Sequence, residues 1–419
     1  MRQKILLGVL WFWAIASQAL QLHVIDERFL SSQAPLPPSY RQGLEALVHR
    51  DLAEAERAFL QASQENPKAA APLLGLAEIA YQRQDPKAAE RYLKQAATVE
   101  PENFHVQTSL GRYLSLIGQY EKAEATLLKA AKQSSKTASA WMTLGDFYAT
   151  FVNRPKEAVN AYQEALKIEP NHAGAYYGLG MSYAKLGESA KALENLRQAA
   201  RLQANNPLPW LAIGQVQAKQ GQLHQALTAA DQALKIQPGL ASARELRGDI
   251  LAAKGDQAAA LREYESLLRK APKLADVQVK AGMLYQARGH LDKAEQAYRA
   301  AIAANPKHAL AYNNLAWLAV ERQQDLAQAA SWAKEAVKLA PKVAQFHDTL
   351  GWVYRAQGKP QEALKALEQA AKLAPADAAI LHHLEVVQEE LGKTSQVKET
   401  SYPRRKRHPF EGFQTPSLK

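Results

Sequence analysis

Apolar and small residues recur along this chain with a period of 34 residues, which two frames extend by one. Frames that begin at residues 36, 70, 104, 138, 173, 207, 241, 275, 309 and 344 bring equivalent positions into register. The eighth position is glycine or alanine in every frame, and proline closes eight of the ten. The twentieth is alanine in all ten once the extra loop residue of the two longer frames is allowed for. A period of this size is the signature of stacked supersecondary repeats.

Each frame has the pattern of two helices. Trp141, Leu144 and Tyr148 occupy the fourth, seventh and eleventh positions of one frame and share one helical face. Glycine at position 15, as at Gly187, can take the left-handed conformation that ends a first helix. The second helix carries alanine at position 20 and a large residue near position 24, as at Tyr298. Small residues let the two helix backbones approach closely, and successive pairs must stack to bury their apolar faces.

The motif residues of the fourth frame resemble the tetratricopeptide repeat. The first helix reads W-x2-L-G-x2-Y over residues 141–148, and the second reads A-x3-Y-x2-A over 158–165, followed by Pro170. The resemblance extends over residues 36–392. It implies an all-α, right-handed superhelical solenoid of about ten helix pairs with a C-terminal capping helix.

This periodicity predicts the organisation of the chain. Residues 1–19 are expected to form a signal peptide or membrane anchor, 20–35 a linker, 378–392 the capping helix and 393–419 a disordered basic tail. The ten repeats of residues 36–377 are expected at 36–69, 70–103, 104–137, 138–172, 173–206, 207–240, 241–274, 275–308, 309–343 and 344–377.

The N-terminus has the pattern of an export signal. Arg2 and Lys4 precede the apolar stretch of residues 5–16, and small residues follow at Ala14 and Ala16. The apolar stretch is shorter than the ~20 residues of a membrane span. It could still remain as an anchor if the polar residues up to Leu22 are tolerated. Both alternatives place the repeats outside the cytoplasm, in the periplasm or tethered to the inner membrane.

Two late frames carry a finer resemblance. Residues 312–319 read YNNLAWLA, and residues 348–354 read DTLGWVY. This pair resembles the terminal repeats of bacterial envelope tetratricopeptide proteins, including those of exopolysaccharide and exosortase-type export systems.

The net charge of +11 is concentrated at the two ends of the chain. Residues 393–419 contain seven bases and two acids, and the run 404–407 is Arg-Arg-Lys-Arg. The long middle is nearly balanced, which argues against a nucleic-acid partner. The tail is either simply solvated or in contact with a membrane surface or an anionic polymer.

Little in the sequence indicates chemistry. The chain has 47% apolar residues and no cysteine, which excludes disulfide scaffolds and thiolate sites. The histidines lack metal-ligand spacing, and we expect His382 and His383 to form a solvated pair. Glu78, Asp146 and Asp249 are interpreted as carboxylates of helix surfaces. We therefore expect no catalytic, metal or cofactor site and no enzymatic activity.

The resemblance places a partner-binding groove on the first helices, at positions 2, 5, 6, 9, 12 and 13 of each frame. Those positions include Thr108, Arg112, Met142, Asp146, Lys280, Asn314 and His382. The residues we predict to bind a partner are Tyr177, Met181, Asn313, Trp317, Asp348, Trp352 and Arg355. Aromatic side chains and arginine dominate interface hot spots. Trp317 and Trp352 could equally pack as core between adjacent first helices.

The sequence thus predicts an exported, non-enzymatic scaffold or adaptor that binds an envelope protein or peptide in its concave groove. An alternative function is an assembly or tethering factor for exopolysaccharide that contacts acidic polymer through lysine and arginine.

Overall fold

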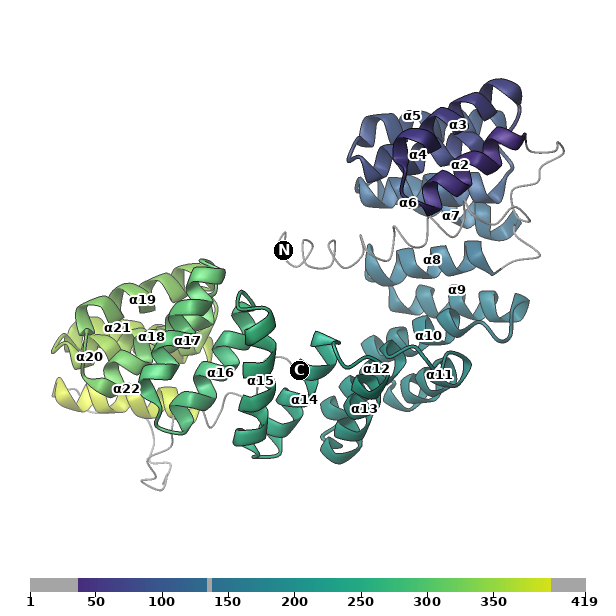
Figure 1. Cartoon of the computed structure of the whole chain (residues 1–419). Coiled ribbons are helices and arrows are strands. Elements are labelled where there is room, and N and C mark those ends of the chain that lie inside the picture. Colours follow the sequence, from purple (N-terminus) through teal and green to yellow (C-terminus); the bar gives the residue numbers. More distant parts are fainter. Residues whose placement is uncertain (1–36, 134–137, 393–419) are drawn as a thin grey trace. The chain divides into compact units, whose positions relative to one another are not determined.

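The computed structural model describes residues 37–133 and 138–392 (Figure 1). The predicted signal or anchor, the linker and the basic tail lie outside these residues. Within the described ranges the chain forms 21 helices and no strands. The expected all-α solenoid of helix pairs is confirmed.

The chain divides into two compact units between Pro209 and Trp210. The first unit contains α2 (Pro38–Val48), α3 (Leu52–Glu65), α4 (Ala71–Gln82), α5 (Pro86–Val99), α6 (Phe104–Leu116), α7 (Tyr120–Gln133), α8 (Ser139–Thr150), α9 (Pro155–Ile168), α10 (Ala173–Leu186) and α11 (Ser189–Leu202). Each helix of this unit packs against the next one, and the first helices of neighbouring repeats also touch, as α6 and α8 do.

The second unit begins within α12 (Leu208–Lys219). It continues with α13 (Leu223–Ile236), α14 (Ala241–Ala253), α15 (Gln257–Lys270), α16 (Ala275–Ala287), α17 (Leu291–Ala304), α18 (Ala309–Arg322), α19 (Leu326–Leu339), α20 (Ala344–Ala356), α21 (Pro360–Leu373) and α22 (Ala378–Glu390). Here too neighbouring helices pack in order, and α22 packs against both α20 and α21. The last apolar face is thereby covered, because Ile380, Leu384 and Val387 of α22 are buried.

Small residues at the eighth position make room for a bulky side chain of the second helix. A Cβ atom on Gly145 would lie 2.5 Å from Cε1 of Tyr162, which is closer than carbon atoms can approach. A Cβ on Gly248 would lie 2.6 Å from the equivalent ring atom of Tyr264. The close approach of the two helices and the burial of the ring therefore both depend on glycine, which has no side chain at this position.

In the sixth repeat the side chain that packs against the first-helix glycine does not come from the second helix. Ala230 stands at position 24, where most other repeats have Phe, Tyr or Leu. Leu246 from the next first helix comes instead to Gly214, and its Cδ2 atom would lie 3.0 Å from a Cβ there. The side chain that fills this space comes from the following repeat.

Helix ends follow from local chemistry. The Asp51, Asp85 and Asp256 side chains each accept a hydrogen bond from the backbone N–H three residues later, at 2.9–3.0 Å. These bonds satisfy donors that have no partner within the first turn. The predicted helix-ending glycines have positive φ, as at Gly187 with φ 79°. None of the described helices is both long and apolar enough to cross a membrane.

Candidate functional site

In the first unit, three charged residues occupy the ninth position of successive first helices. Glu78 lies on α4, Arg112 on α6 and Asp146 on α8. The 34-residue period repeats the same helical face, so their side chains follow one another along the stacked first helices. Glu78 and Arg112 interact electrostatically, as do Arg112 and Asp146. The alternation of charge is negative, positive, negative.

Glu78 is buried, with 1% of its surface exposed. One carboxylate oxygen, Oε1, accepts a hydrogen bond from Gln82 Nε2 at 2.7 Å. The other oxygen, Oε2, has no hydrogen-bond partner among the described residues. Burial raises the pKa of this carboxyl group above its usual value, and the hydrogen bond from Gln82 and the charge of Arg112 oppose that rise. The interpretation of Glu78 as a surface carboxylate was wrong, because the ninth position faces the neighbouring first helix.

Arg112 likewise has a hydrogen-bond partner for only one of its two terminal guanidinium nitrogens. Its Nη2 nitrogen donates a hydrogen bond to Thr143 Oγ1 at 2.7 Å, whereas its buried Nη1 nitrogen has no partner in the described part of the chain. Desolvation lowers the pKa of the guanidinium, and the carboxylates of Asp146 and Glu78 oppose that effect. Asp146 is half-buried and accepts a hydrogen bond from Tyr162 Oη at 2.7 Å; burial raises its pKa.

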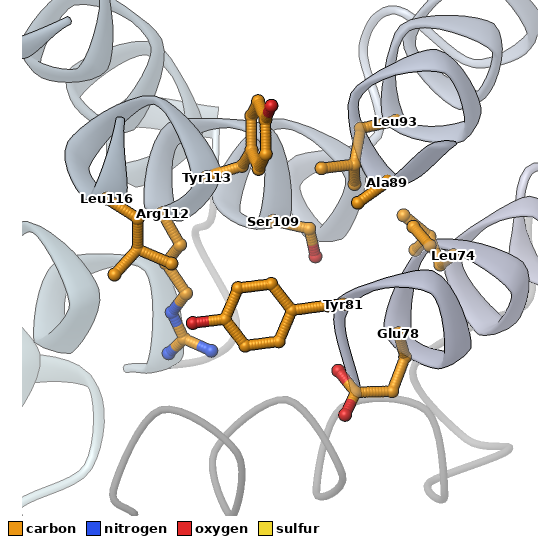
Figure 2. Close-up of a pocket in the computed structure, with 10 residues that line it drawn as sticks. Leu74, Glu78, Tyr81, Ala89, Leu93, Ser109, Arg112, Tyr113 and Leu116 are labelled. Carbon is orange, nitrogen blue, oxygen red and sulfur yellow. The ribbon is translucent and has the colours of Figure 1, made fainter. Parts of the chain in front are cut away.

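A cavity of about 30 Å³ lies between α4, α5 and α6, next to these charges. Figure 2 shows the Tyr81 ring between the Arg112 guanidinium and the Glu78 carboxylate. The lining residues are Leu74, Ala77, Glu78, Tyr81, Ala89, Leu93, Ser109, Arg112, Tyr113 and Leu116. The volume would hold a water molecule or a methyl group. Arg112 is one of the predicted groove residues, whereas the sequence pattern predicted neither the place of Glu78 in this site nor the cavity.

The second unit has a comparable set of charges, but each of them is paired. Lys280 Nζ lies 2.7 Å from Glu245 Oε1 and 2.9 Å from Asp249 Oδ2. Asp249 also accepts a hydrogen bond from Tyr264 Oη at 2.6 Å. Asp249 is 6% exposed, so its assignment to a helix surface was also wrong. In this network Lys280 Nζ and both oxygens of Asp249 each have a protein partner.

Four of the predicted binding residues meet around His383 of the capping helix. His383 Nδ1 lies 2.8 Å from Asp348 Oδ1. Its ring stacks on Trp352 at 4.1 Å between ring centroids and lies 6.4 Å from Trp317. The Arg355 guanidinium lies 4.5 Å from the centre of the Trp352 ring. The expected solvated pair is therefore wrong for His383, whereas His382 is exposed.

The other predicted binding residues lie outside this cluster. Asn313 is 4% exposed, and its Nδ2 donates a hydrogen bond to Asn314 Oδ1 at 3.3 Å. Tyr177 and Met181 are half-buried on α10 in the first unit, and burial raises the pKa of Tyr177. That any of the seven residues binds a partner stays a prediction. The described ranges contain no group of three or more His, Asp or Glu side chains that could hold a metal ion.

Comparisons with solved structures give several similar folds. The match to the crystal structure of the APC/C hetero-tetramer Cut9-Hcn1 has 19% sequence identity and a TM-score of 0.47. It covers 83% of this chain, and this chain spans 62% of the length of that one. The yeast Tom70 structure is 16% identical with a TM-score of 0.44, over 92% of this chain and 94% of that one. The P58(IPK) TPR domain is 15% identical with a TM-score of 0.36, over 87% of this chain and all of that one. No curated protein matches the sequence.

Family comparison covers most of the described helices. Four sequence models, each described as a tetratricopeptide repeat or TPR repeat, match the chain. The matched residues are 40–104, 211–275 and 279–344 for one model, 153–187 and 181–221 for a second, 344–377 for a third and 80–146 for a fourth. The matches extend through both compact units, and several helix pairs in each unit pack a first-helix glycine against a bulky side chain of the second helix. The chain belongs to the tetratricopeptide repeat family.

Proposed function

We propose that this protein is a non-enzymatic scaffold of the bacterial cell envelope that binds a segment of another protein along its first helices. Stacked repeats of this kind present extended surfaces rather than closed reaction sites. A protein-interaction role is consistent with the family. The N-terminal pattern of Arg2 and Lys4 followed by the apolar residues 5–16 supports the envelope location.

The observation that carries this proposal is the pair of unsatisfied polar atoms in the first unit. Glu78 Oε2 and Arg112 Nη1 are buried, have no hydrogen-bond partner among the residues that the structure describes, and belong to residues that line one cavity. A buried polar group left without a hydrogen bond costs about 1–3 kcal/mol. A binding partner that forms hydrogen bonds with both atoms would recover that free energy. A repeat array that only separated two other proteins would gain nothing from leaving these two atoms unsatisfied.

Site-specific photo-crosslinking tests the proposal in cells. A photoreactive phenylalanine analogue replaces Met181 or Trp317, which are half-buried on first helices, and, as a control, Lys167, which is exposed on the second helix α9. We expect a covalent adduct with another protein from the first-helix positions and none from Lys167. Equal adducts from all three positions, or none from Met181 and Trp317, would contradict a binding surface on the first helices.

A further inference from the structure

We propose that the first unit rests against the surface of a lipid bilayer through one edge, which we call the turn edge. The turn edge consists of the turns between the first and second helices of the first four repeats, which are residues 48–52, 82–86, 116–120 and 150–155. This inference rests on the envelope location in the proposed function. It concerns a different surface from the one that the first helices offer to a protein partner.

Large apolar side chains are exposed at the turn edge. In the described ranges, four such side chains are exposed: Val48 at 61%, Leu60 at 40%, Ile117 at 39% and Tyr120 at 40%. All of them except Leu60 belong to the turn edge. None lies in the equivalent turns of the described second unit, which are residues 219–223, 253–257, 287–291, 321–326 and 356–360. The turns of the second unit form without exposed apolar side chains, so the turn itself does not require them.

Hydrogen bonds join neighbouring turns into one continuous edge. Arg83 of the second turn donates from Nη2 to the carbonyl oxygen of Leu52 in the first turn at 3.3 Å. Tyr113, in the last turn of α6, donates from Oη to the carbonyl oxygen of Pro86 at 3.0 Å. Stacked first helices run in the same direction, so their C-terminal ends lie on the same side of the unit.

Tyr120 belongs to a group of aromatic rings at this edge. Its ring centroid lies 6.4 Å from that of Phe147 and 6.3 Å from that of Phe151, both in the next repeat. Phe147 is buried, and Phe151 and Val152 are half-buried. The next repeat therefore supports the tyrosine ring while part of the ring stays exposed. Tyrosine combines an apolar ring with a polar hydroxyl and is enriched at membrane–water interfaces.

The length of chain before α2 favours a bilayer as the occupant. Residues 5–16 are the apolar segment of the proposed signal or anchor, and residues 20–36 connect it to the described helices. This connection spans at most about 60 Å when fully extended. The 11 residues of α2 measure about 17 Å along the helix axis. A retained anchor would thus keep the first unit beside the membrane on a connection long enough for the turn edge to reach it.

The distribution of the apolar side chains also suits a bilayer. Val48 and Ile117 lie two repeats apart, so these side chains project singly and form no large contiguous patch. A protein interface of ordinary size needs such a patch, whereas insertion among lipid headgroups needs only apolar area. Exposed lysines stand at the start of the second helices, at Lys87 and Lys122, and the exposed acid Glu121 lies beside the latter. We therefore expect burial of apolar area, rather than charge, to hold the contact.

Local fluorescence in the full chain tests this contact. The chain has no cysteine, so one introduced cysteine carries one label. Gln119→Cys places a nitrobenzoxadiazole label between Ile117 and Tyr120, and Gln222→Cys places it at the equivalent exposed position of the second unit. Both proteins are reconstituted into vesicles of phosphatidylethanolamine and phosphatidylglycerol, with and without nitroxide-labelled lipid. Because the label reports only its own surroundings, attachment through either end of the chain does not obscure the result.

We expect blue-shifted emission at position 119 that the nitroxide-labelled lipid quenches, and no quenching at position 222. Ile117→Ser combined with Tyr120→Ser should lower the ratio of docked to undocked protein about tenfold, because less apolar area leaves water. Leu60→Ser, on α3 and outside the turn edge, is the matched control and should leave the quenching unchanged. If the double variant melts at a lower temperature, Ile117→Ser alone keeps the ring contacts of Tyr120 and should still reduce the quenching.

Other outcomes would overturn the inference. Quenching that is equal at the two labelled positions, or absent at both, would show that the turn edge has no specific contact with lipid. An emission shift at position 119 that appears with a lipid-free envelope extract, and not with vesicles, would assign this edge to a protein partner. The scaffold function would stand in each case if the crosslinks from Met181 and Trp317 still form.

Discussion

A residue with positive φ follows or ends the first helix of every repeat, and four of these ten residues are not glycine. They are Arg50, Gln84, Asn153 and Gln323, with φ between 51° and 60°. An L-residue in this conformation costs roughly 1–2 kcal/mol relative to glycine, because its Cβ crowds the following carbonyl. The backbone at these four positions keeps the left-handed conformation of the turn, although glycine, which adopts it without strain, is absent.

Gln84→Gly should therefore stabilise the protein by about 0.5–1 kcal/mol, after the greater flexibility of glycine in the unfolded chain is subtracted. Thermal melting and hydrogen exchange of α4 and α5 measure this. Gly187→Ala is the reverse test, since a Cβ there meets no atom within 4 Å and only the φ of 79° is unfavourable. If both variants melted like the wild type, backbone strain at this turn would be negligible.

The buried carboxyl of Glu78 makes stability depend on pH. Its pKa is raised in the folded state, mainly by burial. The folded protein therefore binds this proton more tightly than the unfolded chain does, and stability falls as the pH rises from the unfolded value of about 4.3 through the raised folded value. Glu78→Gln removes that dependence.

We expect Glu78→Gln to gain melting temperature over the wild type at pH 7, and the difference to shrink as the pH falls towards 4. Melting curves of both proteins across this range measure it. The exposed Glu102, whose pKa is lowered chiefly by a hydrogen bond from Lys129, should show no such gain when changed to glutamine. A difference that is constant with pH would mean that Glu78 keeps an ordinary pKa.

At the scale of helices, packing depends on alanine at position 20 of each repeat. Ala226 of α13 is fully buried, and its carbonyl oxygen lies 3.3 Å from the place of a Cβ on Gly214 of α12. The two helices therefore touch almost backbone to backbone. In a stacked repeat array each pair is stabilised mainly by its neighbours.

Ala226→Leu should cost about 1–3 kcal/mol, because the larger side chain forces α12 and α13 apart. Hydrogen exchange should show the loss of protection concentrated in residues 207–274. Ala253→Leu, at an exposed position of α14, is the matched control and should leave protection unchanged. A protection pattern that stays uniform along the chain would contradict the local response.

The capping helix α22 is held to α20 by a stacked ring pair. Trp352→Ala removes the contact of this ring with His383, at 4.1 Å, and with Arg355. We expect the variant to lose at least about 1 kcal/mol of stability, with the lost protection in α20 to α22. Melting temperature and partner capture are measured on the same sample. Unchanged melting with lost capture would instead make Trp352 a binding residue.

At the scale of the whole molecule, the location of the repeats depends on the N-terminal segment. If the N-terminal segment is the export signal or anchor that we propose, Arg2 and Lys4 stay in the cytoplasm, and alkaline phosphatase fused after Gln33 should be active because it reaches an oxidising compartment. N-terminal sequencing then separates a cleaved signal, with a start near Ser17 or Leu20, from an uncleaved anchor. An inactive fusion would exclude both.

The sequence by itself determined the repeat and its helix pairs. Position 8 glycines such as Gly145, position 20 alanines such as Ala226 and the glycines that end first helices all recur with the period of 34 residues. Each of these residues acts through its own backbone or through the partner helix a few turns away in the same repeat. A repeated local pattern is therefore enough to predict them.

Only the tertiary structure decided which polar groups are buried and which of them are paired. Asp249 lies 2.9 Å from Lys280, 31 residues later on the next first helix, and Asp348 lies 2.8 Å from His383, 35 residues later on the capping helix. At the position of the first unit that is equivalent to Asp249, Glu78 Oε2 has no partner within residues 37–133 and 138–392. These outcomes depend on the rotation of each first helix against the next and on the rotamers that bridge them. A periodic pattern is the same in every repeat, so it cannot distinguish a paired charge from an unpaired one.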